Sequence, residues 1–367
     1  MTELMEGSEA MASAAISAGC RFFAGYPMTP FTELLEHFAK RLPPAGGVCV
    51  NAESELEAVG MAWGALATGA RAATGSTGQG LSLMQESFSE ITLAELPLVI
   101  FNMARGQGDY FQSTRGGGHG DYRHVVLAPI DLAEAVELVQ LAFHLADVWR
   151  NPVLIHGDYL LAHLAESVSV EPIDFGPPPA KGWAVDGELG GTGLSRLVSP
   201  LGLGKHRTGG SDGGGSDGPG IEAHLQAVAA KLERITMAEA RCETRYCDDA
   251  SVVIAAFGVP AKFVRYVVEQ LRAEGQSVGF VRPITLWPFP TEAVAAACAG
   301  ARTVAVFEIN AGQMIDDVRL AVLGQAPVVG IGGISTDHSG FGVGALLDVE
   351  LIRSRIEAVL SAAEVPA

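Results

Sequence analysis

The sequence predicts an α/β fold built on a mostly parallel sheet, and three features of the chain support this expectation. Short runs of β-branched and apolar residues alternate with segments of helical periodicity through most of the 367 residues. Glycine-rich turns separate these runs, and the chain contains 45 glycines and 19 prolines. With 48% hydrophobic and 18% charged residues, the chain is too apolar for a disordered protein. Repeated β–α–β units at these spacings predict a sheet covered by helices on both faces.

In the first 165 residues, the ends of several elements can be placed from capping residues. Ser8 is expected to cap a helix that Gly19 ends. Thr29 is expected to cap a second helix, with Pro30 at its first position and its end near Arg41. Further helices are expected at Glu55–Thr68, Leu81–Ala94 and Leu132–Ala146, and strands at Arg21–Tyr26, Val48–Asn51, Arg71–Thr74, Leu98–Met103, His124–Leu127 and Pro152–His156.

The alternation stops after about residue 165 and resumes near residue 236. We expect a first domain over residues 1–165, an inter-domain segment over 166–235 and a C-terminal α/β domain over 236–367. Seven of the sixteen residues at 205–220 are glycine, which fits a linker or a functional lid. Beyond that segment, a helix is expected at Ile221–Glu239, strands at Ser251–Ala256, Ser277–Val281, Thr303–Glu308 and Pro327–Ile331, and helices starting near Val259, Thr291 and Gln313.

The charge of the chain narrows its expected partners. Lysine and arginine number 24 and aspartate and glutamate 42, so the net charge is −18. Nucleic acids and anionic membranes bind basic patches, so we expect neither as a partner. No run of apolar residues approaches the roughly 20 needed to span a membrane. The acidic segment Met1–Glu6 is not followed by the apolar core of a signal peptide, so we expect a soluble, cytoplasmic protein.

The five cysteines are scattered, and no Cys-x-x-Cys motif occurs. The one close pair, Cys242 and Cys247, lacks the companion ligands of a zinc or iron–sulfur site. We therefore expect reduced thiols and no metal cluster bound by this chain alone.

Three segments at strand-to-helix junctions are candidates for ligand binding, because open α/β sheets bind ligands at the carboxyl ends of their strands. Gly25–Pro30 would offer a helix N-terminus to an anion, although Thr29 could simply cap its own helix. Gly75–Gly80 lacks the pattern of a phosphate loop, and its glycines could serve only close packing.

The third junction, Asn51–Glu57, carries three alternate carboxylates at Glu53, Glu55 and Glu57. Acidic residues are common in the first turn of a helix because they complement its dipole. One that faced the interior could instead share a proton with a ring nitrogen. The spacing alone does not decide which of the three points inward.

The long polar, glycine-rich segment Arg105–Arg123 follows a strand and is a further candidate. Arg105 could hold a carboxylate with two hydrogen bonds, and His119 could transfer protons, although a lone loop histidine is more often a surface residue. In the C-terminal domain, Arg282–Pro290 suits a packing or subunit contact, and Glu308–Gln313 joins a strand to a helix.

Taken together, these segments resemble the alpha subunit of 2-oxoacid:ferredoxin oxidoreductases, thiamine-diphosphate enzymes that decarboxylate a 2-oxoacid oxidatively to an acyl-CoA. The segment Asp109–Tyr122 is most similar to the branched-chain 2-oxoacid branch. The matching stretches run in the order of the family and leave out only residues of about 168–235: they are Gly25–Pro30, Ser54–Gly64, Gly75–Gln85, Arg105, Gly118–Tyr122, Arg282–Pro290 and Glu308–Gln313.

The resemblance implies a pyrimidine-binding thiamine diphosphate domain followed by a smaller α/β domain like the C-terminal domain of transketolase. Glu55 matches the glutamate that hydrogen-bonds N1′ of the aminopyrimidine, and the cofactor serves as the electron sink for loss of CO₂. The same resemblance assigns Thr29, Arg105 and His119 to the substrate, and Tyr26, Pro27, Ser76, Thr77 and Gly78 to the cofactor.

Two sets of motifs are missing from the sequence. It lacks the Gly-Asp-Gly and following Asn that hold Mg²⁺ and diphosphate in thiamine enzymes, and it lacks a cluster-binding set of cysteines. The resemblance therefore implies a beta subunit that carries the diphosphate, Mg²⁺ and a [4Fe–4S] cluster. It also implies gamma and ferredoxin-like delta subunits or domains, ferredoxin as acceptor and coenzyme A as co-substrate. This chain alone is expected to be inactive.

The chain departs from the family pattern at two places, since the segment after Arg105 is shorter and residues 205–220 are richer in glycine. An aryl or otherwise bulky 2-oxoacid is therefore an alternative to a branched-chain one. Two further alternatives stay open, a non-oxidative thiamine-dependent half-site and a catalytically silent assembly subunit.

Overall fold

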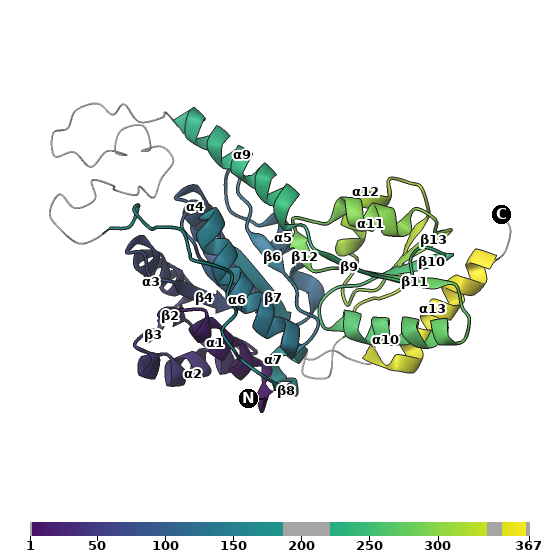
Figure 1. The fold of residues 1–367 in the computed structure, drawn as a ribbon, viewed down its shortest axis with the longest axis horizontal. Coiled ribbons are helices and arrows are strands. Elements are labelled where there is room, and N and C mark those ends of the chain that lie inside the picture. The colour runs from purple at the N-terminus through teal and green to yellow at the C-terminus, as the bar shows by residue number, and fades with distance from the viewer. Residues whose placement is uncertain (1, 186–220, 336–346, 365–367) are drawn as a thin grey trace.

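The computed structural model describes residues 2–185, 221–335 and 347–364 and contains two large sheets and one two-stranded sheet (Figure 1). The glycine-rich stretch 205–220 lies outside the described residues. The elements before the first gap are β1 (Glu3–Glu6), α1 (Gly7–Ser17), β2 (Phe22–Gly25), α2 (Thr32–Arg41), η1 (Pro43–Ala45), β3 (Val48–Asn51), α3 (Glu55–Ala67), β4 (Ala72–Ser76), α4 (Gly78–Leu93), β5 (Val99–Ala104), η2 (Gln107–Asp109), α5 (Tyr110–Arg115), β6 (Val125–Leu127), α6 (Leu132–Trp149), β7 (Val153–Asp158), α7 (Tyr159–His163) and β8 (Ala165–Val168).

The elements after the first gap are α9 (Ile221–Glu239), β9 (Cys242–Arg245), β10 (Val252–Ala255), α10 (Pro260–Ala273), β11 (Val278–Pro283), β12 (Thr285–Trp287), α11 (Thr291–Cys298), β13 (Thr303–Val306), α12 (Met314–Val322), β14 (Val328–Gly330) and α13 (Val349–Glu364).

The first large sheet has the order β12-β6-β7-β5-β4-β2-β3, and all its strands are parallel except β12. Helices cover both of its faces, and neighbouring residues along a strand point to opposite faces. Phe23 packs with α1, α2 and α6, whereas Ala24 packs with α3 and α4. The predicted mostly parallel α/β sheet is confirmed.

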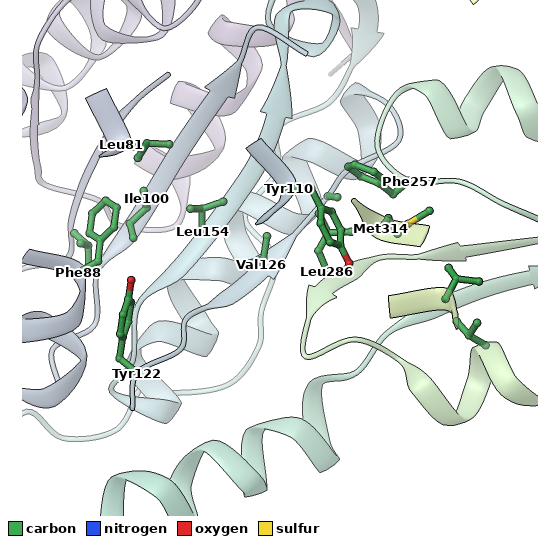
Figure 2. Close-up of a cluster of buried hydrophobic side chains, with 14 of the residues drawn as sticks. Leu81, Phe88, Ile100, Tyr110, Tyr122, Val126, Leu154, Phe257, Leu286 and Met314 are labelled. Atoms are coloured by element: carbon green, nitrogen blue, oxygen red, sulfur yellow. The ribbon is translucent and has the colours of Figure 1, made fainter. Parts of the chain in front are cut away.

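The second large sheet has the order β14-β13-β10-β11-β9, with β9 antiparallel at one edge. Helices α10 and α13 cover one face, and α11 and α12 cover the other. The hydrophobic cluster under α11 and α12 continues into the first sheet. Figure 2 shows Tyr110, Phe257 and Met314 gathered where the two sheets approach each other.

Polar contacts also join the two halves, and they centre on the segment after β5. Gln107 Nε2 donates to Phe257 O over 2.9 Å, and Gln107 Oε1 accepts from Ile309 N over 2.7 Å. Tyr110 Oη donates to Asp317 Oδ2 over 2.6 Å. The boundaries at 165 and 235 stay a proposal. By its hydrogen bonds, β12 belongs to the first sheet although it lies within the segment 236–367.

The structure corrects the predicted start of two helices. Ser8 does not cap α1, because Glu6 occupies the cap position and Ser8 Oγ donates to Ala162 O over 3.2 Å. Helix α2 begins at Thr32 rather than at Pro30. The reason is a turn in which Phe31 N donates to Met28 O over 2.7 Å, so the backbone is not yet helical at Thr29.

The prediction of a loop over Gly75–Gly80 is also wrong, since β4 continues to Ser76 and α4 begins at Gly78. The long segment after Arg105 contains the short helices η2 and α5 rather than a continuous loop. Strand β12 and the two-stranded pairing of β1 with β8 were not predicted, because both depend on partners far along the chain. No helix of the described residues is long and apolar enough to cross a membrane.

Candidate functional site

The predicted site segments meet at the carboxyl edge of the first sheet. Strands β3, β2, β4 and β5 are neighbours in that order and run parallel, so the segments that follow them lie at one edge. Thr29 follows β2, Glu55 follows β3, Ser76 ends β4 and Arg105 follows β5. The topology therefore brings together residues that are up to 76 positions apart in the sequence.

Glu55 is the carboxylate that points inward. It is 3% exposed at the first position of α3, whereas Glu53 and Glu57 are exposed. The side chain of Ser54 caps α3 by accepting from the N–H of Glu57, which fixes the start of the helix. Ser76 Oγ donates a hydrogen bond to Glu55 Oε1 over 3.3 Å. Burial thus separates one carboxylate from its two neighbours.

The first turn of α4 lies against this carboxylate. A Cβ on Gly80 would collide with Glu55 Oε1 and Ser76 Oγ, so glycine is required for the close approach. Thr77 Oγ1 is fully buried at the cap position of α4 and has no hydrogen-bond partner among the described residues. A buried hydroxyl without a partner costs free energy, which makes Thr77 a candidate to bind a ligand atom.

A cavity of about 510 Å³ lies between the first turn of α4 and the second sheet. Its wall comes from the start of α4, from the segment 105–112, from the loop after β13 and from Ile334 and Ser335 after β14. Thr77, Gly78 and Arg105 line it. The hydrogen bonds of Gln107 hold the two sides of the cavity together.

Asp109 is an ionisable residue of the cavity wall that was not among the predicted site residues. A Cβ on Gly78 would lie 2.6 Å from Asp109 Oδ1, so this carboxylate rests against the start of α4. Burial raises the pKa of Asp109, while a hydrogen bond from Asn102 and the charge of Arg105 oppose this rise. Its position a few residues past a strand end is a signal that could have found it.

Asp109 is the outer end of a chain of polar side chains that reaches into the core. Asn102 Nδ2 donates to Asp109 Oδ2 and to Ser113 Oγ, each over 3.4 Å. Ser113 Oγ lies 3.0 Å from Nδ1 of His156, whose pKa burial lowers to about 4. Asn102, Ser113 and His156 are all buried, so these hydrogen-bonded side chains support Asp109 from the side of the core.

Arg105 and Thr29 are brought together, but through the backbone of Thr29. Arg105 Nε donates to Thr29 O over 3.3 Å. Thr29 itself is exposed and is not the cap of α2. The assignment of both residues to the substrate stays a prediction. The contact shows only that the segments after β2 and β5 are adjacent.

Three further predicted residues, Tyr26, Pro27 and His119, do not line this cavity. Tyr26 and Pro27 are exposed at the end of β2. His119 Nε2 lies 2.9 Å from Glu90 Oε1, and its side chain is 50% exposed. Glu90 is twelve residues beyond Gly78, which is about 18 Å along a helix axis. His119 therefore contacts α4 well away from the turn that carries Gly78.

The residues around Glu55 fit the cofactor contact that the resemblance implies. The buried carboxylate can share a proton with a ring nitrogen, and Thr77 offers an unused hydroxyl at the same turn. Gly78 and Gly80 let the carboxylates of Asp109 and Glu55 approach the backbone of this turn closely. Within residues 2–185, 221–335 and 347–364, no group of three or more His, Cys, Asp or Glu side chains is placed to hold a metal ion.

Two family models match the chain. The model of the thiamine-diphosphate-binding domain of pyruvate flavodoxin/ferredoxin oxidoreductases matches residues 13–180. The model of core domain II of pyruvate:ferredoxin oxidoreductases matches residues 250–339. The first match contains Glu55, Thr77, Arg105 and Asp109, and the second contains the loop after β13 that completes the cavity.

Named proteins are similar over most of the chain. The ketoisovalerate oxidoreductase subunit VorB of Methanothermobacter thermautotrophicus is 38% identical over 87% of this chain and 90% of its own length. The 2-oxoglutarate synthase subunit KorA of the same organism is 35% identical over 89% of this chain and 93% of its own length. A solved 2-oxoglutarate:ferredoxin oxidoreductase from Magnetococcus marinus, with 2-oxoglutarate, coenzyme A and succinyl-CoA bound, is similar in fold. Its TM-score is 0.79 at 22% identity, over 98% of this chain and 65% of that one.

Proposed function

The chain belongs to the 2-oxoacid:ferredoxin oxidoreductase family as an alpha-type subunit of an oxidoreductase, and we propose that its first domain binds the aminopyrimidine ring of thiamine diphosphate. In this role the complex decarboxylates a 2-oxoacid oxidatively to an acyl-CoA and passes the electrons to ferredoxin. The observation that carries the proposal is the burial of Glu55 against Ser76 and Gly80, inside the region that the thiamine-diphosphate model matches.

Glu55 has the properties that this contact requires. When bound, the cofactor supplies the electron sink that accepts the electron pair left by CO₂. Glu55 would hold a proton at the ring nitrogen N1′, and Ser76 would fix the orientation of its carboxylate. Because Glu55 is buried, water cannot compete strongly for that hydrogen bond.

The substrate would bind beside Arg105. Arg105 lines the cavity, and its Nε donates to Thr29 O. A planar guanidinium can donate two hydrogen bonds to a carboxylate, as the carboxylate of a 2-oxoacid requires. The cavity of about 510 Å³ has room for a branched or aryl side chain. Tyr26, Pro27 and Thr77 are proposed as further cofactor contacts, and His119 as a more distant contributor to substrate binding.

Partner chains would supply what this chain lacks. We assign the diphosphate, Mg²⁺ and a [4Fe–4S] cluster to a beta subunit, because the sequence has neither the metal-binding motif nor the cysteine set that these groups need. Gamma and ferredoxin-like delta subunits or domains would complete the complex. Coenzyme A is the proposed acyl acceptor.

The experiment that tests the proposal uses the complex purified anaerobically through a tag on this chain. A panel of 2-oxoacids is added, and the visible absorption of any iron–sulfur cluster is followed. Glu55→Gln is compared with Glu57→Gln, which changes an exposed carboxylate two residues away. The thiamine diphosphate retained after gel filtration is measured for each variant.

We expect bleaching by at least one acid in the wild type and in Glu57→Gln, and its loss in Glu55→Gln together with retained cofactor falling at least tenfold. Bleaching that is indifferent to Glu55 would favour a silent assembly subunit. A colourless complex that still decarboxylates would favour a non-oxidative half-site. Either result contradicts the proposal.

A further inference from the structure

We propose that Asp109 makes this cavity selective for 2-oxoacids whose side chain carries no negative charge, an inference that rests on the proposed function. The relatives of this chain bear names that point to two different substrates, one a neutral branched acid and one a dicarboxylic acid. The charges on the cavity wall distinguish between these two classes.

Two ionisable residues stand on the described wall of the cavity, Arg105 and Asp109. Their charges cancel, and the rest of that wall is glycine, amide, hydroxyl and apolar side chains. A 2-oxoacid brings one carboxylate, which Arg105 can bind. A dicarboxylic acid brings a second carboxylate, for which the described wall provides no second cation.

Asp109 is held at the wall. Its carboxylate rests against Gly78, where any larger side chain would collide with it. Asn102, a fully buried residue of β5, donates a hydrogen bond to Asp109 Oδ2. The carboxylate also stands at the start of α4, where the helix dipole favours a negative charge. A second substrate carboxylate would therefore meet a fixed like charge.

Charge rather than size is expected to decide selectivity. The cavity of about 510 Å³ accommodates either class of acid, so sterics alone do not reject the dicarboxylic one. Like charges a few ångströms apart in a partly buried site repel strongly enough to change a rate ratio about tenfold.

The test compares two acids of similar shape in the anaerobically purified complex: 2-oxoglutarate and 5-methyl-2-oxohexanoate, in which an uncharged isopropyl group replaces the distal carboxylate. The measured quantity is the ratio of kcat/KM for 2-oxoglutarate to that for the neutral acid. We expect a ratio well below one in the wild type and a rise of about tenfold in Asp109→Asn. Asp248→Asn removes one negative charge from the exposed turn before β10 and is the matched control.

A second variant adds a negative charge to the cavity wall instead of removing one, and its result does not depend on whether Asp109→Asn folds. Gln79 is exposed in the first turn of α4 and lines the cavity, so Gln79→Glu adds a negative charge where a helix tolerates it. The ratio should fall in this variant. A wild type that prefers 2-oxoglutarate, or a ratio unchanged by both variants, would overturn the inference while leaving the proposed function standing. A complex that turns over neither these acids nor any other 2-oxoacid would overturn both.

Discussion

Glu55 and Asp109 present their carboxylates to the same turn of α4, at two glycines that are separated by one residue. Gly80 leaves room for Glu55, and Gly78 leaves room for Asp109. The two acids come from segments after β3 and β5, and β2 and β4 lie between these strands. The first turn of α4 is therefore the element that sets the positions of both carboxylates.

This packing predicts that a single methyl group disrupts the Glu55 site. In Gly80→Ala the new Cβ would displace Glu55 and Ser76, and we expect thiamine diphosphate retained by the complex to fall at least tenfold. Gly60→Ala is the matched control, because Gly60 lies in the middle of α3 with open space around it. Alanine there should raise the melting temperature slightly and leave retention unchanged. Equal retention in the two variants would contradict the placement of Glu55.

Arg105 is predicted to act on the substrate rather than on the cofactor. Arg105→Lys keeps the charge but loses the planar fork, so we expect KM for the preferred 2-oxoacid to rise about tenfold with retained cofactor unchanged. Steady-state kinetics of the complex measure KM. Arg123→Ala is the control, since Arg123 donates to the backbone carbonyls of Arg115 and Tyr122 in its own segment. An unchanged KM in Arg105→Lys would remove Arg105 from the substrate site.

A buried arginine links the two halves of the chain. Arg282 is 3% exposed and donates to Glu134 on α6 and to Glu243 on β9, each over 2.8 Å. Arg282→Leu would take the buried cation from Glu134 and one of three arginines from Glu243, so the free energy of unfolding should fall by about 3 kcal/mol at pH 7. Urea unfolding of the purified chain measures it. Arg245→Leu removes a half-exposed arginine from the same Glu243 and should cost less than about 1 kcal/mol.

The stability of the Arg282 cluster should also depend on pH. Burial alone would raise the pKa of Glu243, but hydrogen bonds from Arg245 and Arg282 and the charge of Arg282 lower it to about 2. The folded-state pKa is thus below the ordinary value, so this stabilisation is present above about pH 4.5 and is lost as the pH falls toward 2. In Arg282→Leu the loss of stability on acidification through this range should be smaller than in the wild type.

Two buried histidines predict a second pH dependence at milder acidity. Burial lowers the pKa of His124 and of His156 to about 4, so both stay neutral in the folded chain and bind protons on unfolding below pH 6.5. Asp158 acts in the opposite sense, because burial raises its pKa to about 6. The balance predicts that the free energy of unfolding falls by roughly 2 kcal/mol from pH 7 to pH 5. Urea unfolding at the two pH values tests this, and equal stability at both would contradict it.

Much of the fold follows from the sequence because it depends on local patterns. The strand Val48–Asn51 and the helix Ile221–Glu239 have the predicted bounds, since a run of β-branched residues or a 3.6-residue periodicity marks them. Ser8 and Thr29 were assigned as helix caps from their residue type. Both assignments are wrong, because the role of each residue depends on the backbone around it in the folded chain. Ser8 donates to Ala162 O, and Thr29 lies within the turn that joins Met28 to Phe31.

For the site, the sequence by itself predicted the carboxyl edge of a parallel sheet as its place and, through the resemblance, Glu55 as its central carboxylate. Only the tertiary structure decided that Glu55 is the buried one of three acids, that Asp109 rests on Gly78, and that Gln107 joins the two halves. The physical reason is distance along the chain. Gln107 and Ile309 are 202 residues apart, and no local periodicity encodes which side chains meet when two sheets pack together.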